Sequence, residues 1–143
     1  MTGDPQPALD LRLFGDGHVA RYRETSGEDG YIWNGVPILI LTTSRRNGEP
    51  RDVPLIFGTA DDRLVVVASK GGAPEHPWWY RDLTRDGHVR VQVRDRIFDA
   101  TARTATGDER TRLWALMNDL WPSYDRYQAS TDRMIPVVVL EEA

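Results

Sequence analysis

Three β-rich apolar runs joined by short turn signals constrain the fold of this chain more than any other feature. The runs cover residues 36–43 (VPILILTT), 51–57 (RDVPLIF) and 63–69 (RLVVVAS). Asn47-Gly48 separates the first two runs and predicts a type I′ turn, because both residues tolerate positive φ. Asp61-Asp62 marks the second turn. Short turns join antiparallel strands, and Pro54, which cannot donate to a ladder, predicts an edge or a bulge in the middle strand.

The remaining segments predict helices around an antiparallel sheet. We expect helices at residues 9–25, 78–85, 106–121 and 123–130, strands at 89–93, 97–104 and 135–140, and a loop at 24–35. Thr106 and Glu109 have the spacing of a capping box at the start of the third helix. About six antiparallel strands suffice for a small barrel, so the predicted fold class is mainly β with flanking helices, α+β. The 143 residues suit one domain, residues 1–143, with residues 1–8 disordered.

Composition excludes several classes of function. The chain has no cysteine, which rules out disulfides, thiolate catalysis and cysteine-based metal sites, and its three histidines argue against a dedicated zinc or iron site. A net charge of −4 argues against broad nucleic-acid binding. The N-terminus lacks the basic and apolar regions of a signal peptide, and no apolar run is long enough to span a bilayer. A cytoplasmic location is therefore expected.

Basic residues gather at the first turn. Arg45, Arg46 and Arg51 flank it, and hairpin geometry is expected to bring Arg45 or Arg46 close to Arg51. Clustered guanidinium groups are unfavourable unless an anion or carboxylates compensate them. The turn is therefore an anion site, or a solvated turn with Glu49 and Asp52 as local partners.

Two further stretches could contact a ligand. Lys70 follows a strand and precedes Gly71-Gly72, where backbone N–H groups can approach a phosphate or a ring edge, although a plain flexible connection explains the glycines equally well. His76-Pro77-Trp78-Trp79-Tyr80 places three aromatic rings at a helix start, where they either wall a planar ligand or fill the core.

A second aromatic group lies near the end of the third helix. Trp121, Tyr124 and Tyr127 could line a substrate mouth, and a tyrosine hydroxyl could donate a proton. Packing in the core or at its rim is the alternative.

Together these segments resemble the deazaflavin (F420)-dependent nitroreductase and F420H2-dependent quinone reductase family. The resemblance covers roughly residues 21–140 and rests on TTSRRNGEPR (42–51), VPLIF (53–57), VVVASKGGAPEHPWWY (65–80) and YDRYQASTDRMIPVVVL (124–140). It implies a split β-barrel of the FMN-binding-protein type that binds coenzyme F420. Asp52 departs from the family pattern and would place a negative charge near the anion site.

The resemblance implies a role for each matching residue. The implied cofactor contacts are Arg45, Arg46 and Arg51 for the phosphate and oligoglutamate tail, Pro54 and Leu55 for the deazaflavin ring, and Ala68, Ser69, Lys70, Gly71, Gly72, Ala73, His76, Pro77, Trp78 and Tyr80 for the linker and the cofactor wall. Tyr124 and Tyr127 match tyrosines on the substrate side. Either tyrosine, Ser69 or a water could deliver the proton that balances hydride transfer.

The implied reaction is hydride transfer from reduced F420 to a quinone-like or other electron-poor small molecule, with nitroaromatics as adventitious acceptors. An FMN-dependent oxidoreductase on the same barrel and a non-catalytic deazaflavin carrier are the alternatives. The sequence leaves open whether the chain is a monomer or a homodimer. It also leaves open whether the N-terminal segment contacts a membrane surface, which would make the protein peripheral to the inner face of the membrane.

Overall fold

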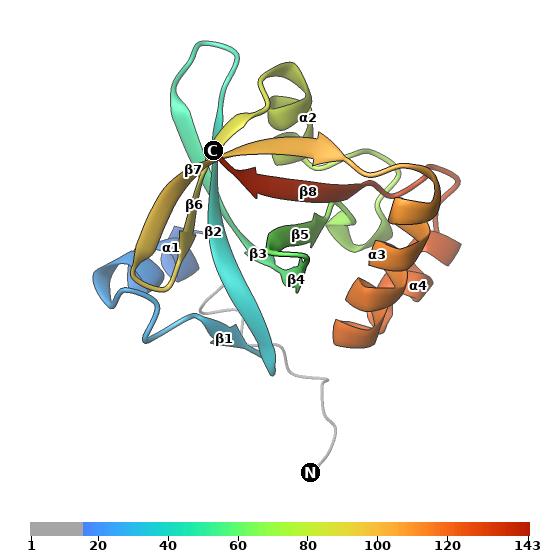
Figure 1. The fold of residues 1–143 in the computed structure, drawn as a ribbon, viewed down its shortest axis with the longest axis horizontal. Coiled ribbons are helices and arrows are strands. Elements are labelled where there is room, and N and C mark those ends of the chain that lie inside the picture. Colours follow the sequence, from blue (N-terminus) through green and yellow to red (C-terminus); the bar gives the residue numbers. More distant parts are fainter. Residues whose placement is uncertain (1–15) are drawn as a thin grey trace.

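The structure is a computed structural model that describes residues 16–143. The predicted disorder of residues 1–8 and the first part of the helix predicted at 9–25 lie outside the described residues. The strands form one curled sheet, and helices lie around it on several sides (Figure 1). No helix within residues 16–143 is both long and apolar enough to cross a membrane.

An eight-stranded antiparallel sheet forms the body of the molecule. Its hydrogen-bonded order is β1-β2-β6-β7-β8-β5-β4, and β3 pairs with β2. The strands are β1 (Ile32–Trp33), β2 (Val36–Ser44), β3 (Pro50–Ile56), β4 (Gly58–Ala60), β5 (Arg63–Val67), β6 (His88–Val93), β7 (Arg96–Thr104) and β8 (Val137–Glu142). Figure 1 shows the sheet curling so that its long strands cross one another.

A bend at Phe57 closes this curled sheet into a split barrel. β3 pairs with β2 along the register Leu39↔Leu55 and Leu41↔Val53, whereas β4 pairs with β5 at the other end of the strand order. Phe57 alone separates β3 from β4, and its ring is buried. One continuous chain segment therefore joins the two ends of the sheet. Within residues 16–143, β3 pairs with β2 and with no other strand, so the edge position that Pro54 predicted is confirmed.

Alternation along β5 and β8 explains their unbroken runs of valine. Val66 and Val138 belong to one buried cluster together with Leu39 and Leu41, and Val65 belongs to a second cluster on the other face. Successive side chains of a strand point to opposite faces, so a strand buried on both faces is apolar throughout. Helices α3 (Gly107–Leu120) and α4 (Ser123–Ala129) cover that second face.

Helices α1 (Asp16–Glu24) and α2 (Trp78–Arg85) pack against other parts of the sheet. α2 packs Trp79 and Leu83 into the cluster that contains Leu39. α1 lies on the opposite side from α3 and α4 (Figure 1) and packs Val19 and Tyr22 with residues of β1 and β2. A 3-10 turn, η2 (Lys70–Gly72), follows β5.

The six predicted strands are all present, and β1 and β4 are additional short ones; β1 falls in the stretch predicted as a loop. The predicted type I′ turn is wrong. Neither Arg46 nor Asn47 has positive φ; Gly48 does, at +88°, and the Gly48 N–H donates to the Arg45 carbonyl at 2.8 Å. This is a three-residue loop in which the glycine takes the left-handed position.

The predicted capping box at α3 is also wrong. Thr106 occupies the N-cap, but its side chain makes no capping hydrogen bond. The Glu109 carboxylate instead accepts from Arg103 at 2.7 and 2.9 Å. A bidentate guanidinium–carboxylate pair is stronger than a bond to a neutral backbone N–H, so Arg103 takes the carboxylate.

Candidate functional site

A cavity of about 630 Å³ lies between β3, the end of β5 and the helices at either side. That volume falls within the range of small-molecule and cofactor sites. Six parts of the chain line it: His18 from α1, Trp33 and Ile38 from β1 and β2, residues 52–56 from β3, Val67 with Ser69, Lys70 and Gly71, Pro77 with Trp78 and Trp79, and Trp121 with Tyr124 and Tyr127.

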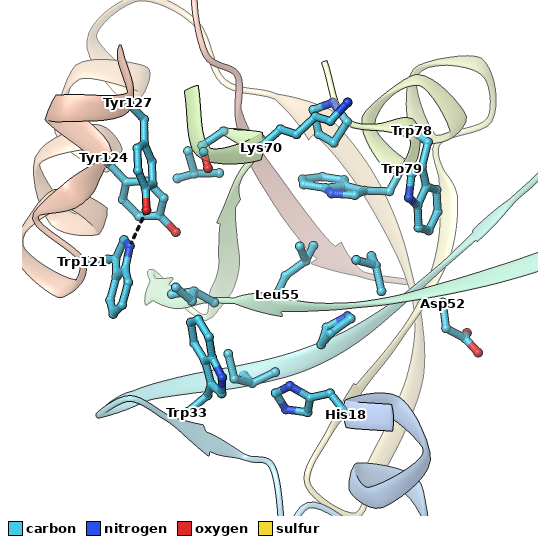
Figure 2. A pocket seen from close by; sticks show the side chains of 18 residues that line it. His18, Trp33, Asp52, Leu55, Lys70, Trp78, Trp79, Trp121, Tyr124 and Tyr127 are labelled. Carbon is cyan, nitrogen blue, oxygen red and sulfur yellow. Dashed lines mark hydrogen bonds between the residues drawn. The ribbon is translucent and has the colours of Figure 1, made fainter. Parts of the chain in front are cut away.

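Aromatic rings stand at opposite ends of this cavity. Figure 2 shows Trp78 and Trp79 at one end, Trp121 with Tyr124 and Tyr127 at the other, and Leu55 between them. Flat aromatic walls with an aliphatic floor favour a planar, apolar ring system as the occupant.

The aromatic end near α4 carries two hydroxyl groups. Tyr127 Oη accepts from Trp121 Nε1 at 3.4 Å, and the rings of Tyr124 and Tyr127 meet edge to face at 6.1 Å. Tyr124 is 4% exposed, and burial raises the pKa of its hydroxyl above the ordinary value. Both tyrosines line the cavity, and burial makes ionisation of the Tyr124 hydroxyl still less favourable than in water.

The loop at the end of β5 is held in a left-handed conformation. Lys70, Gly71 and Gly72 have φ of +47°, +64° and +86°. A non-glycine residue in this region costs roughly 1–2 kcal/mol, and such strain gathers at functional sites. Figure 2 shows Lys70 above the cavity. Its Nζ donates to the Glu75 carboxylate at 3.0 Å, and that ion pair lowers the pKa of Glu75.

Trp78 is supported from behind by Arg51. The Arg51 guanidinium lies 4.2 Å from the centroid of the Trp78 ring, and its Nη2 donates to the Asp82 carboxylate at 3.2 Å. Asp82 is buried and also accepts from Thr43 and Arg85. This network joins the start of α2 to the β2–β3 hairpin.

The structure brings together part of the residue set predicted from the sequence. The predicted residues that line the cavity are Pro54, Leu55, Ser69, Lys70, Gly71, Pro77, Trp78, Tyr124 and Tyr127. Those that lie behind this lining are Arg51, Ala68, Gly72, Ala73, His76 and Tyr80. Arg45 and Arg46 are exposed at the hairpin tip, and no ion pair in residues 16–143 engages either one.

Asp52 is compensated within the protein. Its carboxylate accepts from Arg23 at 2.9 Å and from the Thr42 hydroxyl at 2.6 Å. Figure 2 shows it at the edge of the cavity, pointing away from the rings. The negative charge that was expected near the anion site is therefore paired with the guanidinium of Arg23 in α1.

Sequence reasoning missed His18 and Trp33. His18 is buried, and its Nε2 lies 2.7 Å from the Gly30 carbonyl oxygen. The rings of Trp33 and Trp121 lie 5.9 Å apart, although the residues are far apart in sequence. No local pattern signals such contacts, because α1 and β1 reach the cavity only once the barrel has formed. Within residues 16–143, no group of three or more histidine and acidic side chains could hold a metal ion.

Comparison with known proteins identifies the family. The sequence profile of the F420H(2)-dependent quinone reductase family matches residues 16–142. The chain belongs to this family.

Individual relatives agree with this membership. An F420H(2)-dependent quinone reductase of Mycobacterium tuberculosis is 37% identical over 128 residues, which are 86% of each chain. The solved structure of an F420-H2 dependent reductase (FDR-A) is 41% identical with a TM-score of 0.69, over 73% of this chain and 94% of that chain. A solved structure described as a domain-swapped dimer is 38% identical with a TM-score of 0.72, over 87% of this chain and 94% of that chain. As a member of the F420H(2)-dependent quinone reductase family, the chain is an oxidoreductase with the split-barrel fold.

Proposed function

We propose that this chain is an F420H2-dependent reductase whose acceptor is a quinone-like or other electron-poor planar molecule, with nitroaromatics as adventitious acceptors. The observation that carries the proposal is the cavity itself. An apolar slot of about 630 Å³ with aromatic walls at both ends is bordered by the cation Lys70. The family membership of the chain supports F420 as the cofactor.

The residues present fit an F420 molecule. Pro54, Leu55 and Trp78 would contact the flat deazaflavin, and Ser69 and Gly71 would contact its edge through the loop. Lys70 would pair with the phosphate or the carboxylates of the tail. The protein as a whole has a net charge of −4, so this cation provides the local positive charge that a polyanionic tail requires. We also propose that Arg45 and Arg46 meet the far end of the tail, and that Arg51, Ala68, Gly72, Ala73, His76 and Tyr80 hold the wall in place.

The acceptor would lie against Trp121, Tyr124 and Tyr127. Reduced F420, when bound, supplies a hydride. A quinone that takes up a hydride also takes up one proton to become a hydroquinone. A tyrosine hydroxyl is protonated at neutral pH, and burial raises the pKa of Tyr124 further, so this hydroxyl can donate a hydrogen bond to the oxygen on which charge develops. Tyr127 or Ser69 could pass the proton, either directly or through water.

Titration of the purified apo-protein with F420 and with FMN, followed by fluorescence, tests this function. We expect saturable binding of F420, weaker or absent binding of FMN, and reoxidation of the reduced complex when menadione is added. Tight FMN binding with a yellow purified protein would instead favour an FMN-dependent oxidoreductase. F420 binding without menadione-dependent reoxidation would favour a carrier.

Assembly and location form a separate proposal. We propose a cytoplasmic homodimer; the relative described as a domain-swapped dimer supports the dimer. Light scattering after size-exclusion chromatography should give twice the chain mass. Co-sedimentation with vesicles tests whether the N-terminal segment contacts a membrane surface.

A further inference from the structure

Arg133 makes an unusual set of contacts for a residue outside the cavity lining. It lies between α4 and β8, and its guanidinium donates to backbone carbonyls that are distant in sequence: Nε to Ala73 at 2.8 Å, Nη1 to Ala68 at 3.2 Å, and Nη2 to Ser69 at 2.7 Å. Nη1 also lies 2.9 Å from His76 Nδ1. All four partners belong to the segment that carries the cavity loop.

These contacts enclose the left-handed residues Lys70, Gly71 and Gly72. Ala68 and Ser69 precede those three residues and Ala73 follows them, so one side chain ties both ends of the turn together. Within the turn, the backbone hydrogen bonds are Gly72 N–H to Ser69 at 2.9 Å and Ala73 N–H to Lys70 at 3.2 Å. A strained turn persists when its surroundings over-determine it, and Arg133 supplies that constraint.

The Arg133 segment is itself fixed from α4. Gln128 Nε2 donates to the Arg133 carbonyl at 2.8 Å, and Gln128 Oε1 accepts from the Ile135 N–H at 2.9 Å. Ser130 Oγ touches the Gly72 carbonyl at 3.4 Å, and a Cβ on Gly72 would come within 2.8 Å of the Tyr127 carbonyl. The cavity loop and the helix that carries Tyr124 and Tyr127 are thus packed as one unit.

Only an arginine can make this set of bonds. Guanidinium presents five N–H donors in a fixed plane, whereas an ammonium is a compact donor on a flexible stem. Guanidinium has no acceptor, so His76 Nδ1 must accept, which places the His76 proton on Nε2.

We propose that Arg133 is a positioning residue that holds the segment from Ala68 to His76 in the conformation that lines the cavity. It acts through Ser69 and Lys70, and its effect on cofactor affinity rests on the proposed F420 function. The other charged or titratable groups near His76 are Arg81, whose Nη2 donates to the His76 carbonyl at 3.1 Å, Tyr80, whose ring lies 4.9 Å away, and the Lys70–Glu75 pair. Burial and the Arg133 and Arg81 cations lower the pKa of His76.

Nitrogen-edited NMR of the apo-protein tests the positioning directly. The chain has three histidines, so the His76 signals must first be assigned. They are the signals that are present in the wild-type spectrum and absent from the spectrum of His76→Gln. In the wild type we expect a neutral His76 with its proton on Nε2 and a low titration midpoint. Arg133→Gln should raise that midpoint, because it removes a nearby cation that bonds to Nδ1. A wild-type His76 protonated on Nδ1 would overturn the proposal even if Arg133→Gln failed to fold.

Binding provides the functional readout. Arg133→Gln should weaken F420 binding by about tenfold, because the segment that carries Ser69 and Lys70 is no longer held in place. Arg133→Lys should restore part of the affinity. Arg126→Gln is the matched control, since Arg126 is exposed and its guanidinium donates to Ser123 on its own helix.

Two results separate the proposals from one another. Wild-type protein that does not bind F420 would defeat the proposed function and leave the His76 measurement to decide on Arg133. Normal F420 affinity and an unmoved His76 titration in Arg133→Gln would defeat the role of Arg133 alone.

Discussion

The Arg51 guanidinium lies 4.2 Å from the centroid of the Trp78 ring and also donates to the Asp82 carboxylate. Trp78 and Asp82 both belong to α2, four residues apart, and so lie on the same face of that helix. Arg51 therefore holds a cavity wall rather than facing the cavity. The buried Asp82 carboxylate is the common acceptor, because Thr43 and Arg85 also donate to it, at 2.9 and 3.0 Å.

Replacement of this carboxylate should destabilise the protein. Asp82→Asn leaves Arg51 and Arg85 without a counter-charge, and we expect a loss of about 1–3 kcal/mol, reduced from the fully buried case because both arginines reach solvent. Urea unfolding measures the loss. Asp95→Asn, in the exposed β6–β7 turn, is the control and should change the free energy of unfolding by less than about 0.5 kcal/mol. Equal stabilities of the two variants would contradict the role of Asp82.

The same carboxylate predicts an acid dependence of stability. Burial raises the pKa of Asp82, but the hydrogen bonds from Thr43, Arg85 and Arg51 outweigh it, so the pKa lies below its ordinary value. A carboxyl whose pKa is lower in the folded state stabilises the fold above its unfolded pKa of about 3.9, and that stability is lost as pH falls further. The difference in urea midpoint between wild type and Asp82→Asn should therefore be constant near pH 7 and narrow below about pH 4. If the difference in urea midpoint instead grew below about pH 4, the stabilising role of the ionised Asp82 carboxylate would be refuted.

Lys70 and Glu75 predict opposite effects on cofactor affinity. Lys70→Ala should weaken F420 binding by about five- to thirtyfold through the loss of a charge-assisted contact. Glu75→Gln should strengthen it by about two- to fivefold, because the 3.0 Å ion pair no longer competes for Lys70. Both effects should be larger at low salt. Arg46→Ala at the exposed hairpin tip should have a smaller effect than Lys70→Ala. Fluorescence titration gives the three dissociation constants, and weaker binding by Glu75→Gln would rule out competition.

The tyrosines at the α4 end should affect turnover rather than cofactor affinity. Tyr124→Phe and Tyr127→Phe remove hydroxyls at the proposed acceptor side, so we expect at least about a tenfold fall in menadione turnover. The F420 dissociation constant should stay within about twofold of the wild type. Tyr31→Phe is the control, because Tyr31 packs on Phe57 and Arg94 and does not line the cavity. Loss of F420 binding in both variants would instead assign these rings to the cofactor wall.

Adjacent glycines in the loop offer a matched test of packing. An added Cβ at Gly71 meets nothing within 4 Å, whereas at Gly72 it would lie 2.3 Å from Ser130 Oγ. Both residues have positive φ. Gly71→Ala should therefore cost about 1 kcal/mol from the backbone alone, and Gly72→Ala about 3 kcal/mol with the added overlap. Thermal unfolding compares them, and equal melting temperatures would show that the loop is not packed against α4.

The sequence determined the strands, most helices and the antiparallel pairing, because each depends on residues close together along the chain. Valine-rich runs, Asn47-Gly48 and Pro54 were enough to place the strands and an edge. The details of the first turn and of the α3 start were not accessible in this way. In the first turn, Gly48 alone takes the left-handed conformation that was predicted for both Asn47 and Gly48. At the start of α3, the Glu109 carboxylate pairs with Arg103 and does not complete the capping box with Thr106.

Only the tertiary structure decided which predicted residues meet at the cavity. Three arginines look alike in the sequence, yet Arg51 turns to Trp78 and Asp82, which follow it by many residues, while Arg45 and Arg46 stay in solvent. His18, Trp33 and Arg133 reach the site through closure of the barrel, which places distant segments side by side. The partners of a side chain depend on that closure, and no periodicity or spacing along the chain encodes it.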